Sequence, residues 1–327
     1  MTTTTSNAGR SFRDLINRAG IGLALLGLVI FFSVTTEHFL TPNNITNILT
    51  QITINLILGV GMTFVILIGG IDLSVGSILA FAAVIAGKAI TLPGLGPTEA
   101  ILLAIFAGLL AGLVCGLLNG FLSAYWSIPS FIITLGMLNI ARGAALQVSD
   151  AQTIYAFPKA FEQFGSALIF GIPLVFLLAL ALVGIAWFIL NRTVLGRMIY
   201  GIGNNEEAVR LAGHSVFRYK MIAFSLCGLT AGIAAIVYMA RLNIASPIAG
   251  IGFELNAIAA VIIGGTSLNG GRGSVIGTLM GAFIIGVLAN GLILLGLSDF
   301  MRQMITGVVL IVAVVLDQFR ARYGRAA

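Results

Sequence analysis

The chain has 327 residues, of which 59% are hydrophobic and only 9% are charged, and its mean hydropathy is +1.09. Soluble proteins carry roughly 25% charged residues, so this chain has too little charge to cover a water-facing surface. A soluble enzyme, a disordered protein and a disulfide scaffold are excluded. The net charge of +6 comes from basic residues that stand between apolar blocks, which argues against a nucleic-acid partner. The composition predicts an all-α polytopic membrane protein.

Ten apolar runs follow one another along the chain. A hydrocarbon core of about 30 Å needs about 20 helical residues per crossing. We expect helices near 19–36, 48–69, 73–91, 99–125, 129–148, 168–190, 219–240, 255–268, 274–296 and 301–318. The eighth run is short and leads into a glycine-rich stretch, so it could be a broken or re-entrant helix. The sequence therefore predicts about ten crossings, within a range of eight to ten.

The distribution of basic residues predicts the orientation in the membrane. With a cytoplasmic N-terminus and ten crossings, 12 of the 17 Lys and Arg residues lie inside and four lie outside. Cytoplasmic loops carry the excess of Lys and Arg, so both termini are predicted to be cytoplasmic. The chain then divides into a tail (1–18), one transmembrane domain (19–318) with a cytoplasmic loop at 191–218, and a second tail (319–327). Cys115 and Cys227 lie in apolar runs and are expected to be buried free thiols.

Glycines recur at four-residue spacing in three of the predicted helices, with Gly228 and Gly232 as the shortest series. This spacing puts the small residues on one helix face and lets another backbone approach closely. Packing within one subunit is the plainer interpretation, although a sliding face or a subunit interface needs the same residues. The longer series are Gly108, Gly112, Gly116 and Gly120 in one helix and Gly273, Gly277 and Gly281 in another.

Four polar residues stand out inside apolar surroundings. Asp72 and Ser74 lie in a glycine-rich break between two membrane-length runs, where they could cap the following helix. A charge at that depth is expensive and often functional, so the alternative is a place beside the substrate path. Asn119 and Asn290 could make interhelical hydrogen bonds, or could help to line a cavity for an uncharged, hydroxyl-rich solute.

A second glycine-rich break, Gly264–Gly273, resembles the first, which would fit an internal duplication. It lacks the Lys-Ser/Thr ending of a phosphate-binding loop, and no such motif occurs in the chain. The two histidines, His38 and His214, fall in loops on opposite sides, so they cannot form one metal site. The sequence thus predicts no catalytic residue, no metal site, no cofactor and no enzyme activity in this chain.

The charged residues of the chain are most concentrated in the predicted cytoplasmic loop. Residues 205–211 could form a short helix with Glu206 near its start and Arg210 four residues later. Such a helix is suited to docking another protein. The alternative is an ordinary solvated loop.

Three long motifs resemble those of the sugar permeases of bacterial ATP-binding-cassette importers, and among them the ribose permeases most. They are TVLGRMIYGIGNNEEAVRLAG at 193–213, GGIDLSVGS at 69–77 and IGGTSLNGGRGSVIGTLMGA at 263–282. The resemblance extends over nearly the whole chain. It implies a multi-pass subunit of the bacterial inner membrane that moves a monosaccharide inward, with ribose or another pentose as the first expectation.

The resemblance also implies partners and site residues. Two permease copies would form the pathway, a periplasmic sugar-binding protein would deliver the substrate, and a cytoplasmic ATPase would bind ATP and Mg²⁺. The ATPase would couple to the loop, for which the candidate residues are Gly196, Gly203, Asn204, Glu206, Ala208, Arg210 and Gly213.

Two rival interpretations remain open from the sequence. A permease of a related importer class, for branched-chain amino acids or a sugar-like signal, would have the same general architecture. An ion-coupled carrier would need no ATPase, but it should lose uptake when the ion gradient collapses.

Overall fold

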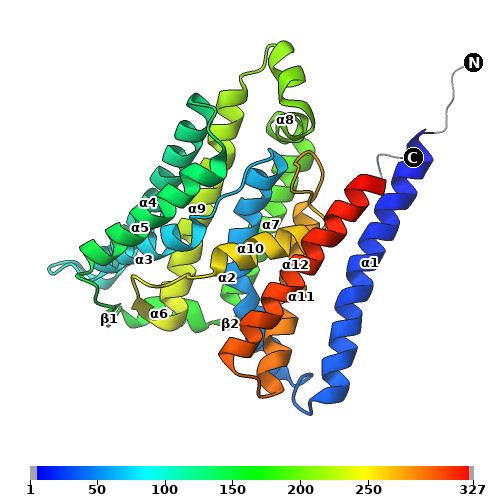
Figure 1. The fold of residues 1–327 in the computed structure, drawn as a ribbon. Helices are drawn as coiled ribbons and strands as arrows, with labels where there is room; N and C mark the ends of the chain where they lie inside the picture. Colours follow the sequence, from blue (N-terminus) through cyan, green and yellow to red (C-terminus); the bar gives the residue numbers. More distant parts are fainter. Residues whose placement is uncertain (1–5, 324–327) are drawn as a thin grey trace, which may run out of the picture.

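The computed structural model describes residues 6–323, which form twelve helices and four two-residue strands (Figure 1). In chain order they are α1 (Ser6–Thr35), α2 (Pro42–Leu67), α3 (Val75–Ile90), α4 (Pro97–Tyr125), α5 (Ser130–Val148), β1 (Ile154–Tyr155), α6 (Lys159–Ser166), β2 (Leu168–Ile169), β3 (Ile172–Pro173), α7 (Leu174–Arg192), α8 (Val194–Leu211), α9 (Val216–Leu242), β4 (Ile244–Ala245), α10 (Phe253–Ile263), α11 (Val275–Leu294) and α12 (Asp299–Tyr323).

Each of the ten predicted apolar runs overlaps a helix. Six helices within the described residues are long and apolar enough to cross a membrane, namely α2, α4, α5, α7, α9 and α11. Shorter apolar helical stretches occur at Gly20–Thr35, α3 and α10. The prediction of an all-α polytopic membrane protein is confirmed, apart from two short pairs of β-strands. Two antiparallel ladders join β1 to β4 and β2 to β3.

Helices α3 and α10 are too short to cross a bilayer alone. The 11 residues of α10 reach only about 16 Å at 1.5 Å per residue. Figure 1 shows α10 lying across the middle of the molecule. The two short helices begin close together. A Cβ atom on Gly76 of α3 would collide with the carbonyl oxygen of Gly250, just before α10.

The closest packing of long helices is between α4 and α9. The four glycines of α4 that share one face all point toward α9, and Gly112 and Gly116 approach nearest. A Cβ atom on Gly112 would collide with the carbonyl oxygen of Gly228, and one on Gly116 with that of Phe224. The α4–α9 contact therefore depends on the absence of side chains.

The second glycine series is only partly a helix face. Gly277 and Gly281 of α11 pack on Gly264 and Ala260, at and near the end of α10. Gly273 lies before α11 with a φ of +152°, so the prediction that it belongs to the same helical stripe is wrong. Its side-chain hydrogen faces Thr266 instead, because the chain must turn there to enter α11.

Both ends of the described chain lie at the same end of the bundle as α8, as Figure 1 shows for the start of α1 and the end of α12. The tails predicted at 1–18 and 319–327 lie partly outside the described residues, and α1 already begins at Ser6. Cys115 and Cys227 are free and buried, as predicted.

Candidate functional site

Helix α8 is longer than the sequence predicts. It begins at Val194, where the Thr193 side chain accepts a hydrogen bond from the Gly196 amide at 3.3 Å. Asn205 interrupts it with non-helical backbone angles (φ −160°, ψ 96°). The Asn205 side chain accepts a hydrogen bond from the Ala208 amide at 3.0 Å and so caps the second segment. The expected short helix at 205–211 is therefore only the second half of a kinked helix.

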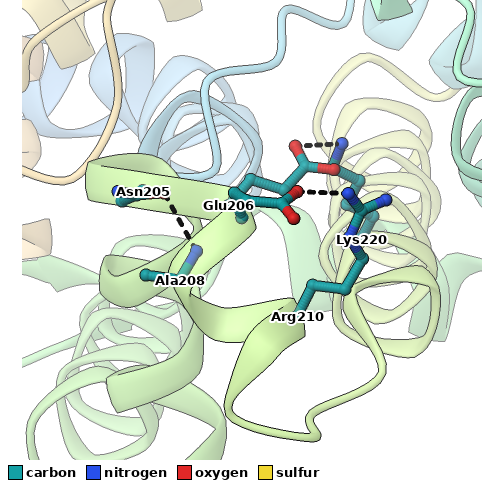
Figure 2. Close-up of polar contacts among 6 residues, drawn as sticks. Asn205, Glu206, Ala208, Arg210 and Lys220 are labelled. Carbon is teal, nitrogen blue, oxygen red and sulfur yellow. Dashed lines mark hydrogen bonds and ion pairs between the residues drawn. The ribbon is translucent and has the colours of Figure 1, made fainter.

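The charged residues of α8 pair differently from the expected spacing. Figure 2 shows Glu206 reaching across to Lys220 of α9, with 2.7 Å between the carboxylate and the ammonium. Arg210 pairs with Glu207 and not with Glu206. Exposed pairs of this kind contribute only about 0.2–1 kcal/mol. Their main effect is to set where the charges stand on this surface.

The first half of α8 is joined to both glycine-rich breaks. A Cβ atom on Gly203 would collide with the carbonyl oxygen of Leu67, the last residue of α2, and with the amide of Gly271. The Gly271 amide donates to that same Leu67 oxygen at 2.9 Å. The end of α2, the 264–273 loop and α8 thus meet around one glycine.

Two side chains of α8 fasten the 264–273 loop. Asn204 donates to the Gly271 carbonyl at 3.1 Å, and the Tyr200 hydroxyl donates to the Gly273 carbonyl at 2.9 Å. Partial burial raises the pKa of Tyr200 above its ordinary value, so its hydroxyl keeps its proton and remains a donor. Tyr200 was not among the sequence candidates, although it lies within the loop motif.

The other loop candidates have local structural roles. Gly196 packs on the carbonyl oxygens at the end of α7, where a side chain would not fit. Gly213 has a φ of +81°, and its amide bonds back to the Arg210 carbonyl at 3.0 Å, which ends α8. Ala208 and Arg210 are exposed.

The two breaks share one turn geometry. Gly69 (φ +78°) donates to the Ile66 carbonyl, and the amide after it donates to the Val65 carbonyl. Gly265 (φ +84°) and the amide after it make the corresponding bonds to Ile262 and Val261. Both helices therefore end in the same left-handed glycine turn. Gly69 is structurally equivalent to Gly265, whereas alignment of the two I-G-G sequences would pair it with Gly264.

Asp72 is fully buried in a network of side chains. Its Oδ1 atom accepts from the Ser74 amide at 2.8 Å and from the Ser74 hydroxyl at 2.5 Å. Asn119 of α4 donates to the Asp72 Oδ2 atom at 3.3 Å and to the Ser74 hydroxyl at 2.9 Å. Ser74 itself makes no side-chain cap to α3. The carboxylate thus holds the segment that leads into α3 and ties it to α4.

Asn290 lies in a different place from this network. It exchanges two 2.9 Å hydrogen bonds with Asn44, near the start of α2. The four predicted pathway residues thus belong to two separate sites, and the structure does not gather them around one cavity. No group of three His, Cys, Asp or Glu residues that could hold a metal ion occurs among the described residues.

Comparisons with known proteins identify the family to which the chain belongs. A family model described as the permease component of branched-chain amino acid transport systems matches residues 44–314. The chain belongs to this permease family.

Curated relatives in this family match almost the whole chain. The ribose import permease of Bacillus subtilis is 44% identical over 310 residues, covering 94% of this chain and 94% of its own. The D-allose transport system permease of Escherichia coli is 40% identical, covering 89% and 88%. The L-arabinose ABC transporter permease of Azospirillum brasilense is 37% identical, covering 96% and 91%. No solved structure matches the sequence significantly.

Proposed function

We propose that this chain is the permease subunit of an ATP-binding-cassette importer for a monosaccharide, with ribose as the first expectation. The observation that carries the proposal is the similarity to ribose, allose and arabinose permeases over about nine-tenths of the chain or more. The family description names branched-chain amino acids, but these relatives are named for sugars. The similarity to these sugar permeases favours a sugar over an amino acid as the substrate.

The proposed division of labour places recognition and energy on partner chains. A second permease copy completes the pathway, a periplasmic sugar-binding protein delivers the sugar, and a cytoplasmic ATPase binds ATP and Mg²⁺. The permease itself is not an enzyme and binds no cofactor. The exposed second half of α8, with Ala208 and Arg210, is the proposed ATPase contact, since it is joined through Gly203 to both helix breaks.

The proposed topology keeps about ten crossings in the bacterial inner membrane, with α3 and α10 as the short, broken members. Both termini and α8 face the cytoplasm. Residues 19–318 form one transmembrane domain, α8 lies within the coupling loop at 191–218, and the predicted tails flank the domain. The location of α8 and both chain ends on one side of the bundle supports this orientation (Figure 1).

Uptake by cells tests the function. In a strain that lacks ribose uptake, expression of this permease with its ATPase and binding protein should restore accumulation of labelled ribose. Vanadate should abolish it, while an uncoupler should leave it intact as long as ATP is maintained. Loss of uptake on collapse of the ion gradient alone would favour an ion-coupled carrier, and uptake of leucine in place of ribose would favour the amino-acid alternative.

Asp72 gives a second prediction, which separates support of the helix break from a role in the pathway. Asp72→Asn keeps an acceptor for Ser74, so we expect most of the uptake to remain at slightly reduced thermal stability. Asp72→Ala leaves the buried amide and hydroxyl donors of Ser74 unpaired and leaves Asn119 only its bond to the Ser74 hydroxyl, which should lower the free energy of unfolding by about 2–4 kcal/mol. Fluorescence-detected melting in detergent measures the stability. Loss of uptake in a stable Asp72→Asn protein would assign the carboxylate to the pathway instead.

A further inference from the structure

A small cleft opens beside Glu206, on the α8 end of the molecule. Its cavity volume is about 290 Å³, just below the range of about 300–1,000 Å³ for small-molecule pockets. It lies between the α4–α5 turn, α8 and α9. Its polar and aromatic side chains are those of Ser123, Ser127, Ser130, Glu206, Lys220 and Phe224.

The lining offers several hydrogen-bonding groups around one aromatic ring. The Ser123 hydroxyl already donates to the Ile128 carbonyl at 3.1 Å and so offers a ligand only an acceptor, whereas the hydroxyls of Ser127 and Ser130 can also donate. Glu206 contributes acceptors and Lys220 contributes donors. The ring of Phe224 supplies an apolar surface in the same cleft. Alternating donors and acceptors beside an aromatic face suit a small, uncharged ring that carries several hydroxyl groups.

The charged pair at the cleft is arranged for such a ligand. Glu206 and Lys220 stand 2.7 Å apart across the gap between α8 and α9 (Figure 2). The two groups already contact each other directly, so the pair neutralises itself. A neutral ligand can bind the carboxylate oxygen and ammonium hydrogens that remain without bringing a counter-charge. Hydrogen bonds to charged groups are stronger than neutral ones, which favours a hydroxyl over an apolar group here.

The cleft is also connected to the break between α2 and α3. The backbone of Gly69 and Gly70 forms part of its lining, and the Ser130 hydroxyl accepts a hydrogen bond from the Ile71 amide at 2.9 Å. Asp72 is the next residue. A ligand in the cleft would therefore touch the segment that leads into α3, on the side of the molecule where the sugar would leave.

We propose that this cleft is a monosaccharide subsite at the release end of the pathway, formed by the serine hydroxyls, Glu206, Lys220 and the Phe224 ring. The inference rests on the proposed function for the identity of the sugar. A cleft of this size accepts one sugar ring but not a helix of a partner protein. The cleft takes only Glu206 from α8, whereas the proposed ATPase contact centres on the exposed Ala208 and Arg210.

Direct binding tests the subsite. The full chain in nanodiscs, without ATPase or binding protein, is dialysed to equilibrium against radiolabelled D-ribose, with leucine as the comparison solute. Saturable ribose binding is expected, with no leucine binding. Ser127→Phe should fill the cleft and weaken ribose binding about tenfold or more. Ser215→Phe, which adds the same ring at an exposed position just before α9 and outside the cleft lining, should leave binding unchanged.

A second variant keeps the test decisive if Ser127→Phe does not fold. Lys220→Met removes the ammonium donor, keeps a long side chain and should also weaken binding. The proposal is overturned if wild-type protein shows no saturable ribose binding, or if folded variants bind as wild type does. It is equally overturned if Ser127→Phe loses the ATPase and still binds ribose. Cellular ribose uptake without binding in the cleft would reject the subsite and leave the proposed function intact.

Discussion

Arg210→Glu is expected to reduce ribose uptake to background while the protein still inserts into the membrane. The Arg210 side chain is 69% exposed, and surface substitutions of this kind usually change stability by no more than about 0.5 kcal/mol. The substitution removes the partner of Glu207 and places a third carboxylate beside Glu206 and Glu207. An ATPase surface that fits a mixed-charge α8 would then meet three like charges, which opposes docking.

The measurement is labelled ribose uptake in cells, together with co-purification of the ATPase. Lys159→Glu is the matched control, since it makes the same charge reversal at the start of α6, outside the predicted coupling loop. It should leave both readouts unchanged. Normal uptake by Arg210→Glu would remove Arg210 from the contact with the ATPase.

Gly203→Ala is expected to lower uptake about tenfold or more without loss of ATPase binding. The added methyl group collides with backbone atoms of Leu67 and Gly271, which cannot rotate away as a side-chain tip could. Overpacking of this kind typically destabilises by about 1–3 kcal/mol. Here it would push α8 away from the ends of α2 and the 264–273 loop. The ATPase would then still dock but would no longer drive transport, because the contact between α8 and the two helix breaks is distorted.

The informative readout is the number of sugars moved per ATP hydrolysed in proteoliposomes, which should fall sharply. Gly201→Ala, two residues earlier in the same helix, is the control. Its methyl group would lie 3.1 Å from the tip of the Val209 side chain, which can shift. An unchanged transport ratio in Gly203→Ala would show that motion does not pass from α8 to the breaks at this glycine.

The positions of the membrane helices could be predicted because a bilayer demands long apolar runs and little else does. The helical structure at the start of α8 could not be predicted in this way. Gly196, Gly201 and Gly203 each disfavour a helix by about 1 kcal/mol relative to alanine, so the segment reads as a loop. Contacts of Gly196 with the end of α7 and of Gly203 with the end of α2 override that preference.

The hydrogen-bond and ion-pair partners of the candidate residues also could not be predicted from the sequence. Glu206 pairs with a lysine 14 residues away, and Asp72 with an asparagine 47 residues away. Each pairing depends on how two helices are placed against one another, which spacing along one chain does not set. Asn44 shows the same limit, since nothing near it in sequence indicates Asn290, 246 residues later.

The two buried thiols have a practical consequence for watching this protein move. Cys115 and Cys227 are the only cysteines of the chain, and both are enclosed by the packing around α4 and α9. Polar maleimides and spin labels should not reach them in the folded protein. The native sequence can therefore serve directly as the background for single introduced cysteines, and distances between α8 and the helix breaks can be recorded without first replacing residues in the tightest interface.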